Sequence, residues 1–176
     1  MKKINTAKTA LSALFCAIIC VLAQISVITP FGIPLTFQTF AVSLCGCMLG
    51  AAYGTVATAV YVILGAAGMP VFTLFRGGAQ ILFGITGGFI FGFIPLAFFC
   101  GLSLKLNKTA LRILSLTTGI FICHLVGMIQ FKFVSGNSFL SAFLLSSLPY
   151  LLKDVFFVFF AYFVSQKIRK KAKSLL

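Results

Sequence analysis

Acidic side chains are almost absent from this sequence, in which Asp154 is the only aspartate or glutamate among 176 residues. Charged residues of both signs make up 9% of the chain, far below the roughly 25% of an ordinary soluble domain. A single carboxylate also excludes the paired acids on which many acid–base enzymes rely. The 61% of hydrophobic residues, with 22 phenylalanines, instead indicates an integral membrane protein.

Motifs for nucleotide binding and for common catalytic centres are missing as well. The sequence contains no GxxxxGK[ST] phosphate loop, no GxSxG and no HExxH. We therefore expect a protein that does not hydrolyse ATP and has no catalytic or metal site. The alternative left open is catalysis within the membrane by His124 and Asp154, although His124 fits better as an interhelical hydrogen-bonding residue. The six cysteines lack CxxC spacing and fit buried small hydrophobic positions.

Apolar segments of about 20 residues are needed to cross a bilayer, and the chain has six candidates. They lie near 9–28, 36–50, 52–67, 81–104, 110–131 and 139–165. The second and third are separated only by LGAAYG, so they are tilted, partly re-entrant or the two arms of a broken hairpin, and we count them as two. The first resembles a signal peptide, but it is too long and no cleavage site follows. The predicted fold is an all-α integral membrane protein: a single membrane domain over 1–176, with six transmembrane helices and a basic tail at 166–176.

The basic residues indicate how these spans are oriented. One set precedes the first span, surrounds the connection before the fifth, or follows the last: Lys2, Lys3, Lys8, Lys105, Lys108, Arg112, Lys167, Arg169, Lys170, Lys171 and Lys173. The other side of the membrane receives only Arg76 and Lys132. Because basic residues favour the cytoplasmic side, we predict six spans with cytoplasmic N- and C-termini. The same pattern argues against a nucleic-acid partner, since the charges do not follow one face.

Asp154 lies inside the last apolar segment, where a carboxylate costs about 2.5 to 3.5 kcal/mol even on a lenient scale of membrane insertion. Such a residue faces an interior cavity by default. Its helical stripe is narrow and polar, and comprises Ser147, Tyr150, Asp154, Ala161 and Ser165. Adjacent residues on a helix point about 100° apart, so a pair with Lys153 is the weaker explanation. We expect a ligand or an interhelical partner for Asp154 instead.

Small and polar residues mark further candidate contacts. Gly46, Gly50 and Gly54 form one GxxxG series and Gly84, Gly88 and Gly92 another, and this spacing lets helices approach closely in lipid. The TGG sequence at 86–88 also offers backbone against which a flat ligand can lie. Thr36 and Gln38 lie at the start of the second span. Ala13 and Ala17 form an AxxxA step, a smooth surface for another membrane helix.

These segments, taken in order, resemble the BioY family, the biotin-specific S components of energy-coupling-factor transporters. The resemblance runs from about residue 8 to 165. It rests on PFGIPLTFQTFAVSLCGCMLGAAYGTVATAVYVILGAAGMPVF, on GGAQILFGITGGFIFGF and on LPYLLKD. The most specific parts are the P-x-T-x-Q start of the second span, the G-x-T-G-G-aromatic turn and the acid in the last span.

The resemblance implies a multi-pass protein of a prokaryotic plasma membrane that binds biotin and has no cofactor of its own. Its implied partners are the lipid bilayer, a transmembrane coupling protein (the T component) and two cytosolic ATPases that hydrolyse ATP. Ala13 and Ala17 correspond to the surface that docks on the coupling protein. The biotin site implied in this way comprises Asp154, Lys153, Tyr150, Gln38, Thr36, Arg76, Thr86, Gly87, Gly88 and Phe89.

The ligand's own chemistry suggests roles within this set. A buried aspartate accepts hydrogen bonds from the ureido N–H groups of biotin, and Lys153, Arg76 and Gln38 are all candidates for its carboxylate. The family pattern G-D-x-x-K is not kept, because Lys153 precedes the acid and Phe157 stands three residues after it. Phe89 stands where Tyr is frequent. An S component for thiamin or riboflavin therefore stays an alternative, as does a solitary secondary transporter, although no clear inverted repeat is visible.

Overall fold

Long apolar helices form almost the whole structure. The computed structural model describes residues 6–29 and 33–174, so that Lys2 and Lys3 lie outside the described residues. Within that part, five helical stretches are long and apolar enough to cross a membrane: Thr6–Gln24, Gln38–Ala66, Gly87–Lys105, Thr109–Ser135 and Phe139–Lys171. Large apolar side chains such as Leu152, Phe156 and Phe163 are exposed on the outside, which fits a surface solvated by lipid. The predicted helical membrane protein is confirmed at this level.

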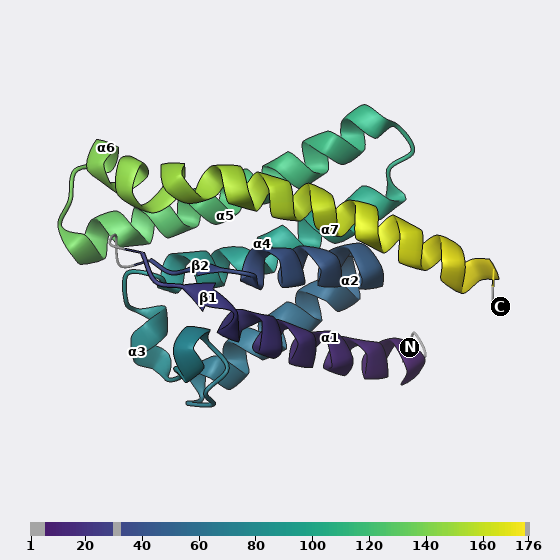
Figure 1. Ribbon diagram of the computed structural model, residues 1–176, viewed down its shortest axis with the longest axis horizontal. Coiled ribbons are helices and arrows are strands. Elements are labelled where there is room, and N and C mark those ends of the chain that lie inside the picture. The colour runs from purple at the N-terminus through teal and green to yellow at the C-terminus, as the bar shows by residue number, and fades with distance from the viewer. Residues whose placement is uncertain (1–5, 30–32, 175–176) are drawn as a thin grey trace.

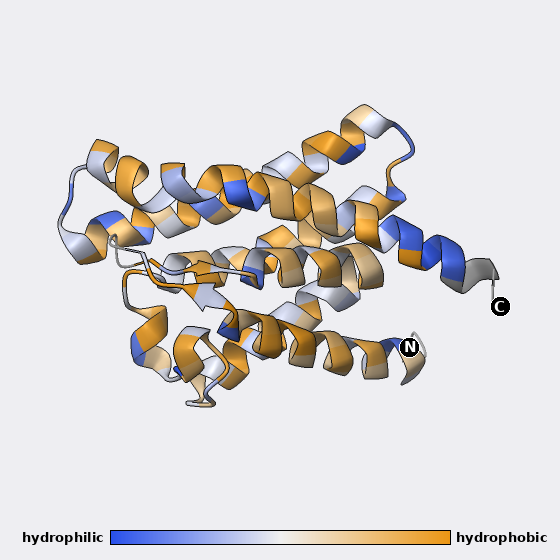
Figure 2. Cartoon of the chain, viewed as in Figure 1, coloured by the Kyte–Doolittle hydropathy of each residue, from blue (hydrophilic) through white to orange (hydrophobic). Residues whose placement is uncertain are grey.

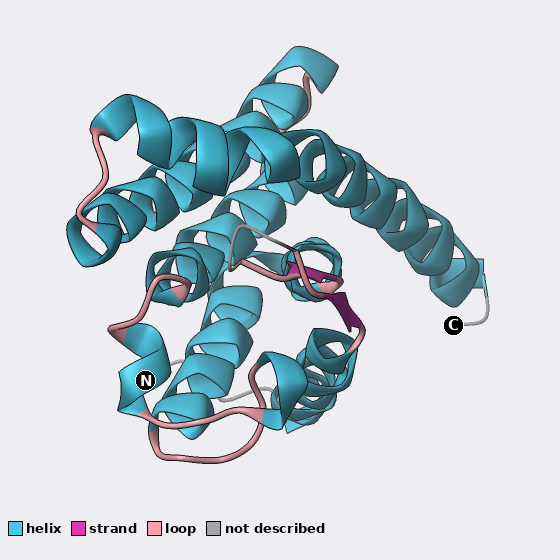
Figure 3. Cartoon of the chain, turned by 60° about the vertical axis from the view of Figure 1, so that its left-hand side comes forward, coloured by secondary structure: helices cyan, strands magenta, loops and turns pink. Residues whose placement is uncertain are grey.

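The elements follow one another along the chain with short connections (Figures 1 and 3). They are α1 (Thr6–Gln24), β1 (Ser26–Val27), β2 (Leu35–Thr36), α2 (Gln38–Ala66), η1 (Thr73–Phe75), α3 (Ala79–Leu82), α4 (Gly87–Leu102), η2 (Ser103–Lys105), α5 (Thr109–Ser135), α6 (Phe139–Ala142), η3 (Phe143–Ser147) and α7 (Leu148–Ser174). β1 and β2 pair antiparallel, with Ser26 opposite Thr36. This short pair, which the all-helical prediction did not include, aligns the connection between α1 and α2.

The element α2 is a hairpin of two helical arms rather than one straight helix. Gly50 has φ 81° and ψ 172° and interrupts the helix. The side-chain Nε2 of Gln38 lies 2.6 Å from the hydroxyl of Tyr61, whereas 23 residues of continuous helix would separate them by about 35 Å. A Cβ on Gly54 would lie 2.8 Å from the Cα of Gly46. The two predicted segments around LGAAYG are thus antiparallel arms, and Figure 1 shows the sharp turn between them.

The segment before Asp154 is also irregular. Residues Phe143–Ser147 form a π turn, η3, between α6 and α7. Pro149 follows this turn, and a proline removes one backbone N–H from the helical ladder. Beyond the apolar part, α7 continues to Ser174. The predicted basic tail at 166–176 is therefore the helical end of α7 as far as the structure describes it.

Close helix contacts hold the bundle together. A Cβ on Gly46 would collide with the backbone oxygen of Ala97 in α4, and a Cβ on Gly92 would approach the backbone of Cys123 in α5. The predicted role of the two glycine series in helix packing is confirmed at these positions. Five of the six cysteines are buried and Cys20 is half-buried, which agrees with their interpretation as small core residues.

Basic segments gather at one end of the bundle. The start of α1, the connection between α4 and α5, and the end of α7 lie together there (Figure 1), and Figure 2 shows the end of α7 and that connection as hydrophilic. The turn of the α2 hairpin reaches this end too, because Arg169 Nη1 lies 3.4 Å from the backbone oxygens of both Cys47 and Met48. Lys132 is near the far end of α5. The second arm of α2 also runs away from the basic end, toward the loop that contains Arg76.

Candidate functional site

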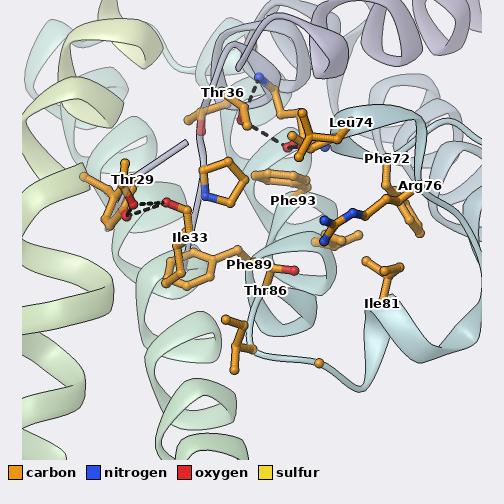
Figure 4. Close-up of a pocket in the computed structure, with 18 of the residues that line it drawn as sticks. Thr29, Ile33, Thr36, Phe72, Leu74, Arg76, Ile81, Thr86, Phe89 and Phe93 are labelled. Atoms are coloured by element: carbon orange, nitrogen blue, oxygen red, sulfur yellow. Dashed lines mark hydrogen bonds between the residues drawn. The ribbon is translucent and has the colours of Figure 1, made fainter. Parts of the chain in front are cut away.

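A cavity of about 330 Å³ lies at the end of the bundle away from the basic segments. Its walls come from the β1–β2 connection, the start of α2, the 72–76 segment, α3, α4, α5 and α7. The α2 hairpin brings residues 36–39 close to residues 72–76. Residues 36–39 lie at the start of its first arm, and residues 72–76 follow the end of its second arm. Figure 4 shows the residues that line this cavity, with Thr29 and Ile33 on one side and Arg76 on the other.

Asp154 lines the cavity from α7 and is buried, with 7% of its surface exposed. Its Oδ2 atom is 3.2 Å from Nε2 of His124 in α5, and the other ring nitrogen, Nδ1, is 2.7 Å from the hydroxyl of Ser147. The predicted interhelical partner is thus present, and His124 has the predicted hydrogen-bonding role. The Nε2 atom has no hydrogen bond of good geometry among the described residues, so the hydrogen bond to Ser147 is the contact that fixes the histidine ring beside the carboxylate.

Lys153 also contacts Asp154, with Nζ 2.6 Å from Oδ1. The pair with Lys153, predicted to be the weaker explanation, is therefore present beside the interhelical partner, because the long lysine side chain bends around the helix to the carboxylate. Its Nζ also donates to the backbone oxygen of Thr36 at 3.1 Å. Asp154 Oδ1 has no hydrogen bond of good geometry within the described residues, despite this ion pair. A carboxylate oxygen has two lone-pair directions, so the buried Oδ1 atom has acceptor capacity that no described residue uses.

Gln38 belongs to a hydrogen-bond network that ties the two arms of α2 to the 72–76 segment. Its Oε1 accepts from the hydroxyls of Thr36 at 3.0 Å and Thr73 at 3.2 Å, and its Nε2 donates to Tyr61 at 2.6 Å. The Tyr61 hydroxyl in turn donates to the backbone oxygen of Val71 at 3.3 Å. With these partners Gln38 shapes the cavity wall, and it is the weakest of the three candidates for a carboxylate.

Tyr150 joins α7 to the connection between the strands. Its hydroxyl donates to the backbone oxygen of Ile33 at 2.5 Å and lies 2.7 Å from the hydroxyl of Thr29, which also donates to Ile33 at 2.6 Å. Figure 4 shows the last of these bonds from Thr29 to Ile33. The loop that covers this side of the cavity is therefore held by the helix that carries Asp154.

Apolar side chains complete the walls. Phe89 lines the cavity with Phe93, one turn further along α4, and with Phe72 and Ile81 from the segment before α4. The ring of Phe89 meets that of His124 edge to face, with centroids 5.8 Å apart. Sequence reasoning named Phe89 and missed Phe93, although their four-residue spacing on one helix predicts a shared face.

Arg76 points into the cavity from the 72–76 segment (Figure 4). Its side chain is exposed, in contrast to the buried Asp154. The segment is well anchored, because the backbone N–H of Phe72 donates to the Arg76 oxygen at 2.9 Å and the Phe75 N–H donates to Gln24 Oε1 at 2.8 Å. The cavity is thus lined by a buried carboxylate and by an exposed guanidinium.

Two predicted ligand contacts lie elsewhere. Gly87 and Gly88 are buried and do not line the cavity, whereas Thr86 does. A Cβ on Gly87 would collide with the backbone oxygen of Leu82, and one on Gly88 would meet that of Val126. The structure therefore gives both glycines a packing role at the start of α4. Ala13 and Ala17 are exposed together along α1, far from the cavity lining.

The site suits an elongated ligand that has N–H donors at one end, an apolar middle part and an anionic group at the other end. Asp154 can accept from N–H groups, the phenylalanines can cover an apolar body, and Arg76 can pair with an anion. Comparison with known proteins agrees with this reading, because the model of the BioY family matches residues 1–174. The chain belongs to the BioY family.

The relatives of this BioY-family chain are named for one vitamin. The biotin transporter BioY of Thermotoga maritima is 45% identical over 69% of this chain and 72% of its own. The probable biotin transporter BioY of Pyrococcus horikoshii is 39% identical over 84% of this chain and 87% of its own. The fold is that of a crystal structure of the S-component for biotin from an ECF-type ABC transporter, with a TM-score of 0.85, 24% identity, and coverage of 97% of this chain and 95% of that chain.

Proposed function

We propose that this protein is the biotin-binding S component of an energy-coupling-factor transporter and mediates biotin uptake. The observation that carries the proposal is the buried Asp154 at one side of an otherwise mostly apolar cavity, in a chain whose BioY relatives are named biotin transporters. A volume of about 330 Å³ lies in the range of roughly 300–1,000 Å³ that small-molecule sites occupy.

We assign biotin one orientation in the cavity, with its ureido ring at Asp154 and its carboxylate at Arg76. Its ureido ring has two N–H donors, and we assign these to Asp154, whose Oδ1 keeps acceptor capacity. The sulfur-containing ring and the valeryl chain lie between Phe72, Phe89 and Phe93. The carboxylate then points to the mouth, where Arg76 binds it. Lys153 already neutralises Asp154, so we give it the supporting role of holding the acid in its charged form.

Uptake requires a defined topology and partners. We assign six membrane spans, with the two arms of α2 counted separately, and cytoplasmic N- and C-termini in a prokaryotic plasma membrane. The gathering of basic segments at one end supports this orientation, and it places the cavity toward the outside. ATP hydrolysis belongs to two cytosolic ATPase subunits, joined through a T component that docks on the face of Ala13 and Ala17. No cofactor is assigned to the chain itself.

The test is calorimetric titration of the detergent-purified protein with biotin, with thiamin and riboflavin in parallel. We expect saturable, tight binding of biotin and none of the other two vitamins. Biotin amide, in which the carboxylate is replaced by a neutral group, is the matched ligand and should bind more weakly while keeping the ureido contact. Saturable binding of thiamin or riboflavin without binding of biotin would reject the assigned ligand.

A further inference from the structure

A second cleft lies at the basic end of the bundle, between η2, the start of α5 and the end of α7. It has a volume of about 430 Å³, and its lining includes Ser103, Arg112, Tyr162, Gln166, Arg169 and Lys170. Three of these side chains are cationic. The biotin site and the docking face of α1 use none of them, so the function proposed above gives this cleft no role.

No acidic side chain is available near the cations of this cleft. Asp154 is the only acidic side chain in the sequence, and 15 residues of α7 separate it from Arg169, which is about 22 Å of helix. Like charges that converge without a carboxylate repel one another, and an anion supplied from outside the chain relieves this repulsion. The formal net charge of +13 shows that the side chains of this protein supply few anions to balance its cations.

Both arginines are held in place by the backbone. Arg112 Nε donates to the oxygen of Leu106 at 2.7 Å, and its Nη1 lies 3.5 Å from the Tyr162 hydroxyl. Arg169 Nη1 donates to the oxygens of Cys47 and Met48, which satisfies carbonyls at the end of the first α2 arm. A guanidinium carries five N–H donors, so each arginine keeps three donors for another partner. Two fixed guanidiniums of this kind match the geometry of a phosphate.

The surroundings of the cleft indicate where that phosphate comes from. Next to it, the outer faces of α5 and α7 carry exposed apolar side chains, including Ile113, Leu114 and Phe163. Tyr162 lies between the cationic and the apolar zones of α7, and tyrosine is enriched at the depth of lipid headgroups. A soluble phosphate would use only the cations, whereas a phospholipid would use the cations and the apolar faces together.

We propose that this cationic cleft binds the phosphodiester headgroup of an anionic phospholipid, with Arg112, Arg169 and Lys170 as its ligands and the acyl chains along α5 and α7. Basic pockets between transmembrane helices are known to receive such headgroups. The lipid would tie the end of α7 to the α4–α5 connection and to the turn of the α2 hairpin. It would thereby hold the bundle at a defined depth in the leaflet at this end.

The experiment is native mass spectrometry of the detergent-purified protein, titrated with phosphatidylglycerol and separately with zwitterionic phosphatidylcholine. We expect one phosphatidylglycerol bound at concentrations at which phosphatidylcholine is not retained. The double variant Arg112→Gln, Lys170→Gln should weaken this binding about tenfold or more. Lys170→Gln alone, which breaks no hydrogen bond found among the described residues, should weaken it severalfold.

A matched control removes the same charge at the same end of the protein but outside the cleft. Lys108 and Lys167 are both exposed and do not line it. The variant Lys108→Gln, Lys167→Gln should therefore bind phosphatidylglycerol like the unmodified protein. Biotin affinity and melting temperature of the Lys170→Gln protein should also be unchanged, which separates loss of the lipid from loss of the fold.

Four outcomes would overturn the proposal. Equal retention of the two lipids would show that charge does not select the ligand. Equal loss of phosphatidylglycerol in the control and cleft variants would show a diffuse surface effect, and undiminished binding in the cleft variant would assign the cations to another partner, such as an acidic protein segment. If millimolar inorganic phosphate displaced bound phosphatidylglycerol as effectively as added phosphatidylglycerol does, the cleft would be a site for free anions. None of these readouts depends on biotin.

Discussion

Replacement of Asp154 by asparagine tests the assignment of the ureido contact directly. The variant keeps the shape of the side chain and removes its negative charge. In the native protein Asp154 is 7% exposed, lies 2.6 Å from Lys153 Nζ and 3.2 Å from His124 Nε2, and keeps acceptor capacity on Oδ1. We expect the variant to lose the charged hydrogen bond to biotin and to leave Lys153 without its charged partner, although its hydrogen bond to the Thr36 oxygen remains.

The expected magnitude follows from that one interaction. A hydrogen bond to a charged group contributes about 1.5–3 kcal/mol, and about 1.4 kcal/mol corresponds to a factor of ten in affinity. Biotin binding should therefore weaken by roughly 10- to 100-fold. The loss of folding stability should be smaller than for a fully buried ion pair. The Lys153 side chain is 22% exposed, so its ammonium group can turn toward water when the carboxylate is removed.

The assay is calorimetric titration of the Asp154→Asn protein with biotin and with biotin amide, accompanied by its melting temperature. Both ligands should lose the same factor, because they share the ureido ring and differ only at the other end. Ser165→Ala is the control, since Ser165 is buried on the same face of α7 and, among the described residues, its hydroxyl donates only to the Tyr162 oxygen. An unchanged biotin affinity in a folded Asp154→Asn protein would refute the ureido assignment.

Three further predictions concern other parts of the chain. Arg76→Gln should weaken biotin about tenfold and leave biotin amide unchanged in the same titration, and an equal loss for both ligands would mean that Arg76 does not bind the carboxylate. Gly50→Ala should lower the melting temperature by roughly 2–12 °C, because φ 81° and ψ 172° form a backbone region that is essentially confined to glycine and costs other residues about 1–3 kcal/mol. The loss should come from this strain and not from a clash, since the added methyl meets no described atom within 4 Å; an unchanged melting temperature would contradict a tight turn here. Ala13→Leu with Ala17→Leu should spare biotin binding and reduce co-purification with the T component, whereas Leu11→Phe on the opposite flank of α1 should not, and loss of biotin binding would argue against a docking role.

Much of the membrane architecture follows from local patterns along the chain. Apolar length predicted the helical spans, and the isolated acid predicted a buried functional position, because the cost of charge in hydrocarbon depends on little else. The stripe of Ser147, Tyr150, Asp154 and Ser165 is buried as its helical spacing required. Eight of the ten predicted ligand contacts line the cavity. Gly87 and Gly88 failed to do so because a glycine pair serves helix packing and ligand approach equally well.

The partners of these residues depended on the tertiary structure. Hydropathy could not decide between a tilted, a re-entrant and a hairpin arrangement around Gly50, since all three share one local sequence. The contacts of His124 with Asp154 and of Gln38 with Tyr61 join residues 30 and 23 positions apart, and no periodicity encodes such distances. The sequence by itself thus determined which segments are long and apolar enough to cross a membrane, and it singled out Asp154 as the residue whose burial in hydrocarbon needs a reason. Only the packed fold decided what surrounds that residue, because hydrogen bonds and ion pairs act over a few ångströms between segments whose approach is set by the whole bundle.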